Sequence, residues 1–125
     1  MDRCHLFNFG CREVIGLDRG ISCLVFTLNF LGVRTRSSCQ GHMDESRYNF
    51  PWIYICSEDV EKLTPYLERY NRFAEVEWKV SLHLPTAVWV VRPTKIDRGP
   101  VKLQKEAVYL SIFLAEQSIK KEHLV

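Results

Sequence analysis

Three features that would narrow the function are missing from this 125-residue chain: an excess of charge, a long apolar run and an even number of cysteines. Seventeen basic side chains against fifteen acidic ones leave a net charge of +2. That balance does not by itself indicate a nucleic-acid binder. Any basic binding site must therefore be local.

No stretch is long and apolar enough to suggest a membrane span. The longest apolar-rich run, Ile21 to Val33, is interrupted by polar residues and is shorter than the roughly 20 residues a spanning helix needs. The sequence does not open with a charged segment, an apolar stretch and a cleavage site, which would indicate secretion. The cysteines number five, which argues against a complete set of disulfides. We therefore expect a cytoplasmic protein with reduced thiols and no membrane partner.

The composition is that of a folded domain. With 46% hydrophobic residues the chain can bury a core without metal or disulfide bonds, which excludes an intrinsically disordered class. Chains of roughly 100 to 150 residues usually build one core. No internal repeat, low-complexity tract or linker divides the sequence, so we predict a single domain over residues 1–125.

Apolar periodicity predicts a first helix after Asp18. Its stripe repeats at helical spacing and comprises Ile21, Leu24, Val25, Leu28 and Leu31. Asp18 is suited to the N-cap and Gly32 to the C-terminal stop. Before this helix, the short apolar patch from Leu6 to Phe9 indicates an edge strand.

Two predicted strands follow, separated by the polar loop 40–49. Alternation predicts a strand over Val33 to Cys39, with Val33, Thr35, Ser37 and Cys39 on one face. The apolar run Pro51 to Cys56 predicts the second strand. We expect the two to be neighbours in one sheet, because a short connection usually joins adjacent elements.

The rest of the chain is predicted to form a helix, a β-hairpin and a second helix. After Ser57 a helix is predicted, with a kink or a restart at Thr64 and Pro65. Residues 75–84 alternate strictly between apolar and polar, and the run 87–91 completes an antiparallel hairpin. A long C-terminal helix follows Gly99 and Pro100, with an apolar stripe of Leu103, Ala107, Leu110 and Leu114.

This order of elements predicts the α+β class. The economical arrangement is a mainly antiparallel sheet of about four to five strands with the helices packed on one face, a two-layer sandwich. Trp52 and Trp78 lie on strand patterns, and we expect both in the core.

The segment Ser37-Ser38-Cys39-Gln40-Gly41-His42 is the candidate binding site. Small side chains and a glycine let backbone N–H groups turn inward around an anion, while hydroxyl, amide and imidazole groups add donors. Arg34, Arg36 and Arg47 are close enough in sequence to supply positive charge. A phosphate, a carboxylate or a nucleotide would suit this combination. A plain polar strand end is the structural alternative.

Two further chemistries are open at the same segment. Cys39 beside His42 is a candidate nucleophile, its thiolate stabilised by an imidazolium, although a free cysteine is also a common core residue. The Cys39 to His42 spacing, with Cys56 and His83 on nearby predicted strands, also permits a metal. A convincing zinc site usually has two local ligand pairs, and the second is missing, so we predict no metal site.

A resemblance to known families rests on this same part of the chain. Leu28-Asn29, the box at 37–42 and Pro51-Trp52-Ile53 resemble a small uncharacterised bacterial family with an SCQGH or SCEGH box and a following P-W/Y strand. More distantly, the segment is similar to the tRNA wybutosine-synthesising protein 3 family, in which a Leu-Asn helix leads into a strand ending Ser-Ser-Cys-Ser-Gly-Arg. His42 stands where that family has arginine.

That second family is associated with S-adenosylmethionine-dependent methyl transfer on a modified guanosine of tRNA. The resemblance implies a site at Ser37, Ser38, Cys39 and Gly41 and a nucleotide-like ligand.

The leading functional hypothesis is therefore a domain that binds a small anionic or nucleotide-like ligand at the Ser37 to His42 loop. An enzyme acting on a nucleotide or RNA, methyltransferase-like or using Cys39 or His42, is the second hypothesis. An interaction module that self-associates through a sheet edge or the C-terminal helix is the third. The sequence names no cofactor.

Overall fold

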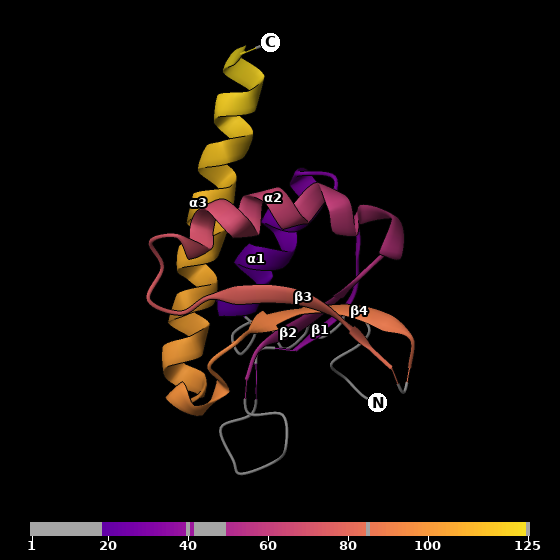
Figure 1. Cartoon of the computed structure of the whole chain (residues 1–125). Coiled ribbons are helices and arrows are strands. Elements are labelled where there is room, and N and C mark those ends of the chain that lie inside the picture. Colours follow the sequence, from indigo (N-terminus) through magenta and orange to yellow (C-terminus); the bar gives the residue numbers. More distant parts are fainter. Residues whose placement is uncertain (1–18, 40, 42–49, 85, 125) are drawn as a thin grey trace.

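The computed structural model describes residues 19–39, 41, 50–84 and 86–124, which form three α-helices and a four-stranded sheet (Figure 1). The elements in chain order are α1 (Arg19–Phe30), β1 (Thr35–Cys39), β2 (Trp52–Ile55), the 3-10 helix η3 (Ser57–Asp59), α2 (Val60–Asn71), β3 (Trp78–His83), β4 (Val88–Pro93), the 3-10 helix η4 (Ile96–Arg98) and α3 (Pro100–Leu124). The strand predicted at Leu6 to Phe9 lies outside the described residues.

The strand order in the sheet is β1-β2-β4-β3, and every neighbouring pair is antiparallel. This confirms the α+β class and the prediction that β1 and β2 are neighbours. Figure 1 shows α1 and α2 over one face of the sheet, while α3 stands upright beside them and extends past them at its C-terminal end. No helix among the described residues is long and apolar enough to cross a membrane.

The core lies between the sheet and the helices. Ile53, Ile55 and Val91 contribute fully buried side chains from β2 and β4, and Trp78 adds its indole from β3. The predicted helical stripes face them, and these buried side chains are Ile21, Leu24, Leu28, Leu103, Ala107, Leu110 and Leu114. We call the sheet face that carries these strand residues the inner face and the opposite one the outer face.

The end of α1 fixes the direction of β1. Gly32 has φ +91°, a conformation that favours glycine. Its N–H donates to the carbonyl of Asn29, and the N–H of Val33 donates to the carbonyl of Leu28 at 2.8 Å. These two bonds form a Schellman motif, so the predicted stop at Gly32 is confirmed.

The helix after β2 differs from the sequence prediction. α2 is one continuous helix with Pro65 inside it, and the predicted restart at Thr64 is wrong. The Thr64 hydroxyl donates to the carbonyl of Val60 at 2.9 Å, a bond within the helix, so it does not cap a new one.

The β3–β4 hairpin is confirmed, but β3 begins at Trp78 and not at Glu75. The Asn71 side chain sets this start. Its amide Nδ2 donates to the carbonyl of Trp78 at 2.8 Å, and its Oδ1 accepts from the N–H of Trp78 at 3.0 Å. The end of α2 thus satisfies the backbone of the first strand residue.

Candidate functional site

A β-bulge at Arg36 decides which side chains of β1 face the helices. Thr35 lies opposite Ile55, and Ser37 lies opposite Tyr54, with an irregular register between them. Since successive residues of β2 point to opposite faces, Thr35 is on the inner face and Ser37 on the outer face. The prediction that the odd-numbered residues of this strand share one face is therefore wrong beyond the bulge.

Beyond the bulge, Cys39 lies opposite Trp52 on the outer face. Trp52 itself is partly exposed there, so the prediction that it belongs to the core is wrong, whereas Trp78 is buried as predicted. The indole of Trp52 and the ring of Tyr54 are neighbours on β2, with centroids 4.6 Å apart. The outer face thus carries an aromatic pair on one of its two central strands.

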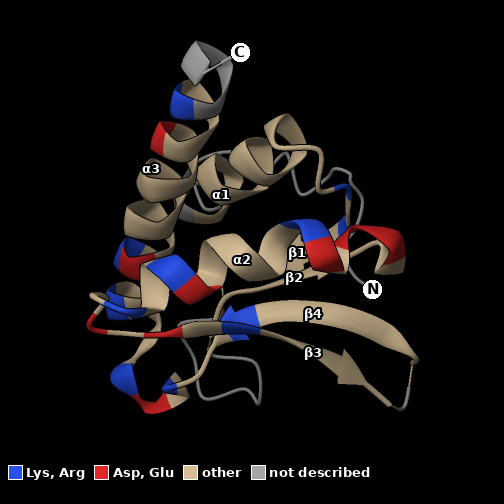
Figure 2. Ribbon diagram, turned by 45° about the horizontal axis from the view of Figure 1, so that its top comes forward, with Lys and Arg blue, Asp and Glu red and all other residues tan. Residues whose placement is uncertain are grey.

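Two cations lie opposite each other on the same face. Lys79 of β3 pairs in register with Arg92 of β4, and Figure 2 shows basic residues side by side where β3 begins and β4 ends. Neither forms an ion pair with another residue that the structure describes. The Arg92 guanidinium lies 5.8 Å from the centroid of the Phe50 ring. Like charges directly opposite each other destabilise a sheet, and an anion between them would relieve that repulsion.

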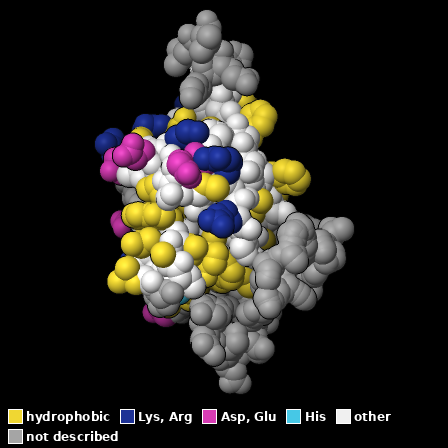
Figure 3. All heavy atoms as spheres, turned by 90° about the vertical axis from the view of Figure 1, so that its right-hand side faces the viewer, with side chains coloured by type: hydrophobic (Ala, Val, Ile, Leu, Met, Phe, Trp, Pro, Cys, Tyr) yellow, Lys and Arg dark blue, Asp and Glu magenta, His cyan; other side chains and the backbone are white. Residues whose placement is uncertain are grey.

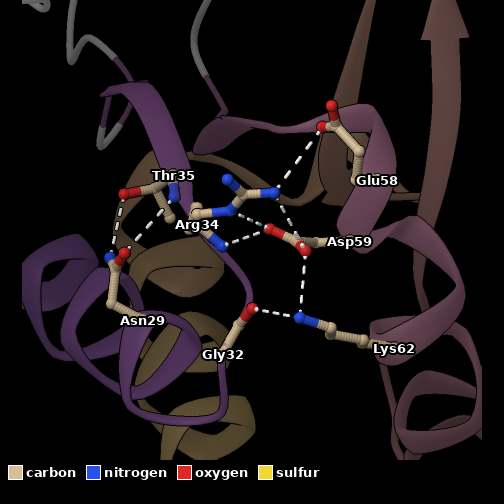
Figure 4. Close-up of polar contacts among 7 residues, drawn as sticks. All are labelled: Asn29, Gly32, Arg34, Thr35, Glu58, Asp59 and Lys62. Atoms are coloured by element: carbon tan, nitrogen blue, oxygen red, sulfur yellow. Dashed lines mark hydrogen bonds and ion pairs between the residues drawn. The ribbon is translucent and has the colours of Figure 1, made fainter.

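Arg34, a predicted site residue, is held by carboxylates (Figure 4). The Asp59 carboxylate, which is 1% exposed, accepts from the backbone N–H and the side-chain Nε of Arg34, both at 2.9 Å. Lys62 Nζ lies 3.2 Å from the other Asp59 oxygen, and Glu58 lies 3.6 Å from the guanidinium. The Arg34 hydrogen bonds hold the pKa of Asp59 well below its usual range.

The consequence is that the charge of Arg34 is already balanced. On the face that Figure 3 shows, basic and acidic side chains lie next to one another above the apolar side chains. Sequence reasoning missed Asp59. Asp59 directly precedes α2 but forms no side-chain cap on that helix, so the sequence held no local signal for its contact with Arg34.

Asn29 ties the end of α1 to the first residue of β1. Its Nδ2 donates to the Thr35 hydroxyl at 2.9 Å, and its Oδ1 accepts from the Thr35 N–H at 3.4 Å. The Leu-Asn pair that carried part of the family resemblance thus has a structural role, because Leu28 is fully buried beside it.

Gly41 has φ +96°, and a Cβ there would lie 2.9 Å from the carbonyl carbon of Phe50. The two ends of the polar loop approach each other closely at this point. The glycine is therefore required by the chain itself, and no ligand needs to be invoked to explain it.

The other predicted site residues are distributed as follows. Arg36 is exposed at the bulge, and Ser37 and Ser38 are partly exposed on opposite faces. Cys39 is 4% exposed. Gln40, His42 and Arg47 lie outside the described residues.

The metal alternative gains no support. The described residues contain no group of three or more His, Cys, Asp or Glu that could hold a metal ion. Cys39 and Cys56 lie at opposite ends of β2, because Cys39 pairs with Trp52 and Cys56 follows Ile55. His83 is on β3, which β4 separates from β2.

A cleft of about 360 Å³ lies between the end of α2 and α3, where the sequence predicted no site. Aromatic rings of Tyr70, Phe73 and Phe113 form its wall, with centroids 5.4 to 5.5 Å apart. Burial, followed by the charge of Glu106, raises the pKa of Tyr70 to about 12. Tyr109 and Ile112 continue the lining along α3.

Comparisons with models of known protein families, with curated proteins and with solved structures found no match to this chain. The resemblances to the SCQGH-box family and to the wybutosine-synthesising family stay predictions.

Proposed function

We propose that the protein binds a nucleotide-like ligand on the outer face of the sheet. The base stacks against the Trp52–Tyr54 pair, and a phosphate lies near Lys79 and Arg92. The observation that carries the proposal is the conjunction of this aromatic pair with two opposed cations on the sheet face away from α1 and α2.

The aromatic pair suits a base. Every nucleobase has a flat π-face, and stacking on an aromatic side chain contributes about 1–3 kcal/mol per base without demanding one sequence. Four-stranded sheets commonly present such rings to unstacked bases. Trp52 and Tyr54 are partly exposed, so part of the surface of the pair faces solvent.

The cation pair suits a phosphate. Lys79 is exposed and Arg92 partly exposed, and their repulsion falls when an anion lies between them. Both are on the strands beyond β2, whereas Arg36 is exposed on the far side of it at the bulge. A nucleotide stacked on β2 would meet positive charge on the side of β4 and β3.

The proposal keeps the predicted ligand class but shifts its centre from the loop to the strands. Arg34 contributes to the fold, as its contacts with Asp59 indicate. Cys39 is buried, which argues against a nucleophile, since reactive thiols are partly exposed. The loop residues His42 and Arg47 stay candidates for additional contacts.

The test is a calorimetric titration of the full chain with the four nucleoside monophosphates and their nucleosides, with inorganic phosphate and with a mixed-sequence RNA octamer. Trp52→Leu should weaken the best nucleotide by roughly 10- to 100-fold, because one stacking surface is lost. Lys79→Ala should weaken the nucleotide but leave binding of the corresponding nucleoside unchanged.

Arg72→Ala is the matched control, because it removes the same charge from an exposed position at the end of α2. It should bind as the parent does. If none of the probes binds, or if Trp52→Leu binds as tightly as the parent, the outer face is not the site.

A further inference from the structure

The exposed side of α3 is unusually apolar for a solvent-facing helix surface. Ile112, Tyr109 and Ile119 are 51%, 53% and 55% exposed. With the exposed Lys105 and Glu116 they form a row on the side opposite the buried stripe. We call Lys105, Tyr109, Ile112, Glu116 and Ile119 the outer row of α3.

The spacing of this row is that of a helix–helix seam. Its positions follow one another by steps of four, three, four and three residues, which is the spacing of a heptad repeat. A docked helix would remove these apolar side chains from water. Figure 1 shows the C-terminal turns of α3 extending past α1 and α2.

The row is also complementary to itself. We propose that α3 pairs with α3 of a second copy of this chain, antiparallel, about a two-fold axis that passes beside the outer row, level with the Leu110–Ser111 peptide bond. An axis there places Lys105 of one chain opposite Glu116 of the other. The same register places Tyr109 opposite Ile112, because both pairs are centred on that bond.

The charges point to a second copy more than to an unrelated helix. Neither Lys105 nor Glu116 is in an ion pair within the part of the chain that the structure describes, whereas Lys102, one turn away on the cleft side, bonds Glu75 and Glu106. In the two-fold pair each lysine meets a glutamate, and the contact occurs twice. A partner of other sequence would need the same charge order in reverse.

The neighbouring cleft widens the docking surface. Phe73 is 67% exposed at its rim, and Tyr109, Ile112 and Glu116 are shared between the cleft and the outer row. The α3 helix of the second copy would therefore lie in a shallow groove between Phe73 and α3 of the first copy. This is the helix-in-groove mode of recognition. The outer face of the sheet plays no part, so this inference is independent of the nucleotide proposal.

Sedimentation equilibrium of the full chain over the micromolar range tests the pairing. The parent should dimerise. Lys105→Glu and Glu116→Lys should each weaken dimerisation by about tenfold or more, because each single change creates like charges at both symmetric contacts. The double variant Lys105→Glu/Glu116→Lys should return the dissociation constant close to the parent's value.

Two control variants test whether dimerisation depends on the outer row of α3 or on any exposed charged or apolar side chain. Glu68→Lys reverses an exposed charge on α2, and Phe26→Asp removes an apolar side chain of α1 that is 76% exposed; both should dimerise as the parent does. Ile112→Asp should leave a folded monomer. The pairing would be overturned by a monomeric parent, by single charge reversals without effect, or by a double variant that stays dissociated. A monomeric parent is also the result expected if α3 binds a different protein.

Discussion

Two arginines at the start of β1, Arg34 and Arg36, have different surroundings. At its start Arg34 is joined to a buried carboxylate and to a second, exposed one. At the bulge Arg36 is exposed, and the strand then continues onto the outer face beside Trp52 and Tyr54. The start of the strand is fixed to α1 and α2, whereas the Arg36 side chain at the bulge is exposed to solvent.

This difference shows that the partners of each residue in a polar cluster have to be identified before the cluster is assigned a function. Asp59 lies 25 residues from Arg34 in the sequence, yet it accepts two hydrogen bonds at 2.9 Å from that residue. A cation that already forms ion pairs within the protein attracts an anionic ligand less strongly. Three predictions, in order of decreasing effect on stability, test this distinction.

Asp59→Ala should be the most destabilising change. It leaves the Arg34 backbone N–H without its acceptor and removes the anchor of Lys62, so the midpoint of thermal unfolding should fall by about 10 °C. Glu58→Ala is the control, since its contact with Arg34 is exposed, and it should change the midpoint by no more than about 2 °C. Equal midpoints for the two variants would show that the network does not hold this end of the strand. Differential scanning calorimetry provides both values.

Gly41→Ala should have an intermediate effect at the other end of β1. The new Cβ meets the Phe50 backbone and the residue keeps an unfavourable φ, so the thermal midpoint should fall by about 5 °C. Gly99→Ala is matched in φ, at +90°, but has nothing within 4 Å of the new atom. The difference between the two variants measures the close approach alone, and a midpoint for Gly41→Ala no lower than that of Gly99→Ala would contradict it.

The pH dependence of stability is the finest probe. The lowered pKa of Asp59 contributes stability above its unfolded value of about 4, and that contribution is lost as the pH falls through the folded pKa. Glu75, whose pKa the hydrogen bond from Lys102 lowers, acts in the same direction. The difference in urea midpoint between the parent and Asp59→Asn should therefore shrink as the pH falls from neutral toward 3. A constant difference would mean that the carboxylate charge is not the stabilising feature.

The repeating parts of the fold were predictable from the sequence. Helix periodicity identified α1 and α3, and strict alternation identified the β3–β4 hairpin, because each pattern is repeated over several turns or residues. The glycine stop at Gly32 was also confirmed, since a left-handed residue after a helix has a recognisable sequence signal.

The candidate site was less predictable, because it depends on single residues. A bulge has no periodic signal, so the faces of Ser37 and Cys39 were assigned wrongly. The partnership of Arg34 with Asp59 and the opposition of Lys79 and Arg92 both depend on tertiary register. The local sequence located a polar segment, but it did not indicate which of its charged side chains form ion pairs within the fold.

The bulge at Arg36 has a consequence for how relatives of this chain should be aligned. A relative with a regular β1 would present the same serine and cysteine to the same face with one residue fewer, since the bulge inserts a single residue between Thr35 and Ser37. A gap at this position would therefore conserve the surface, whereas a substitution there changes its charge. In an alignment, the length of β1 is therefore more informative about this surface than the identity of residue 36.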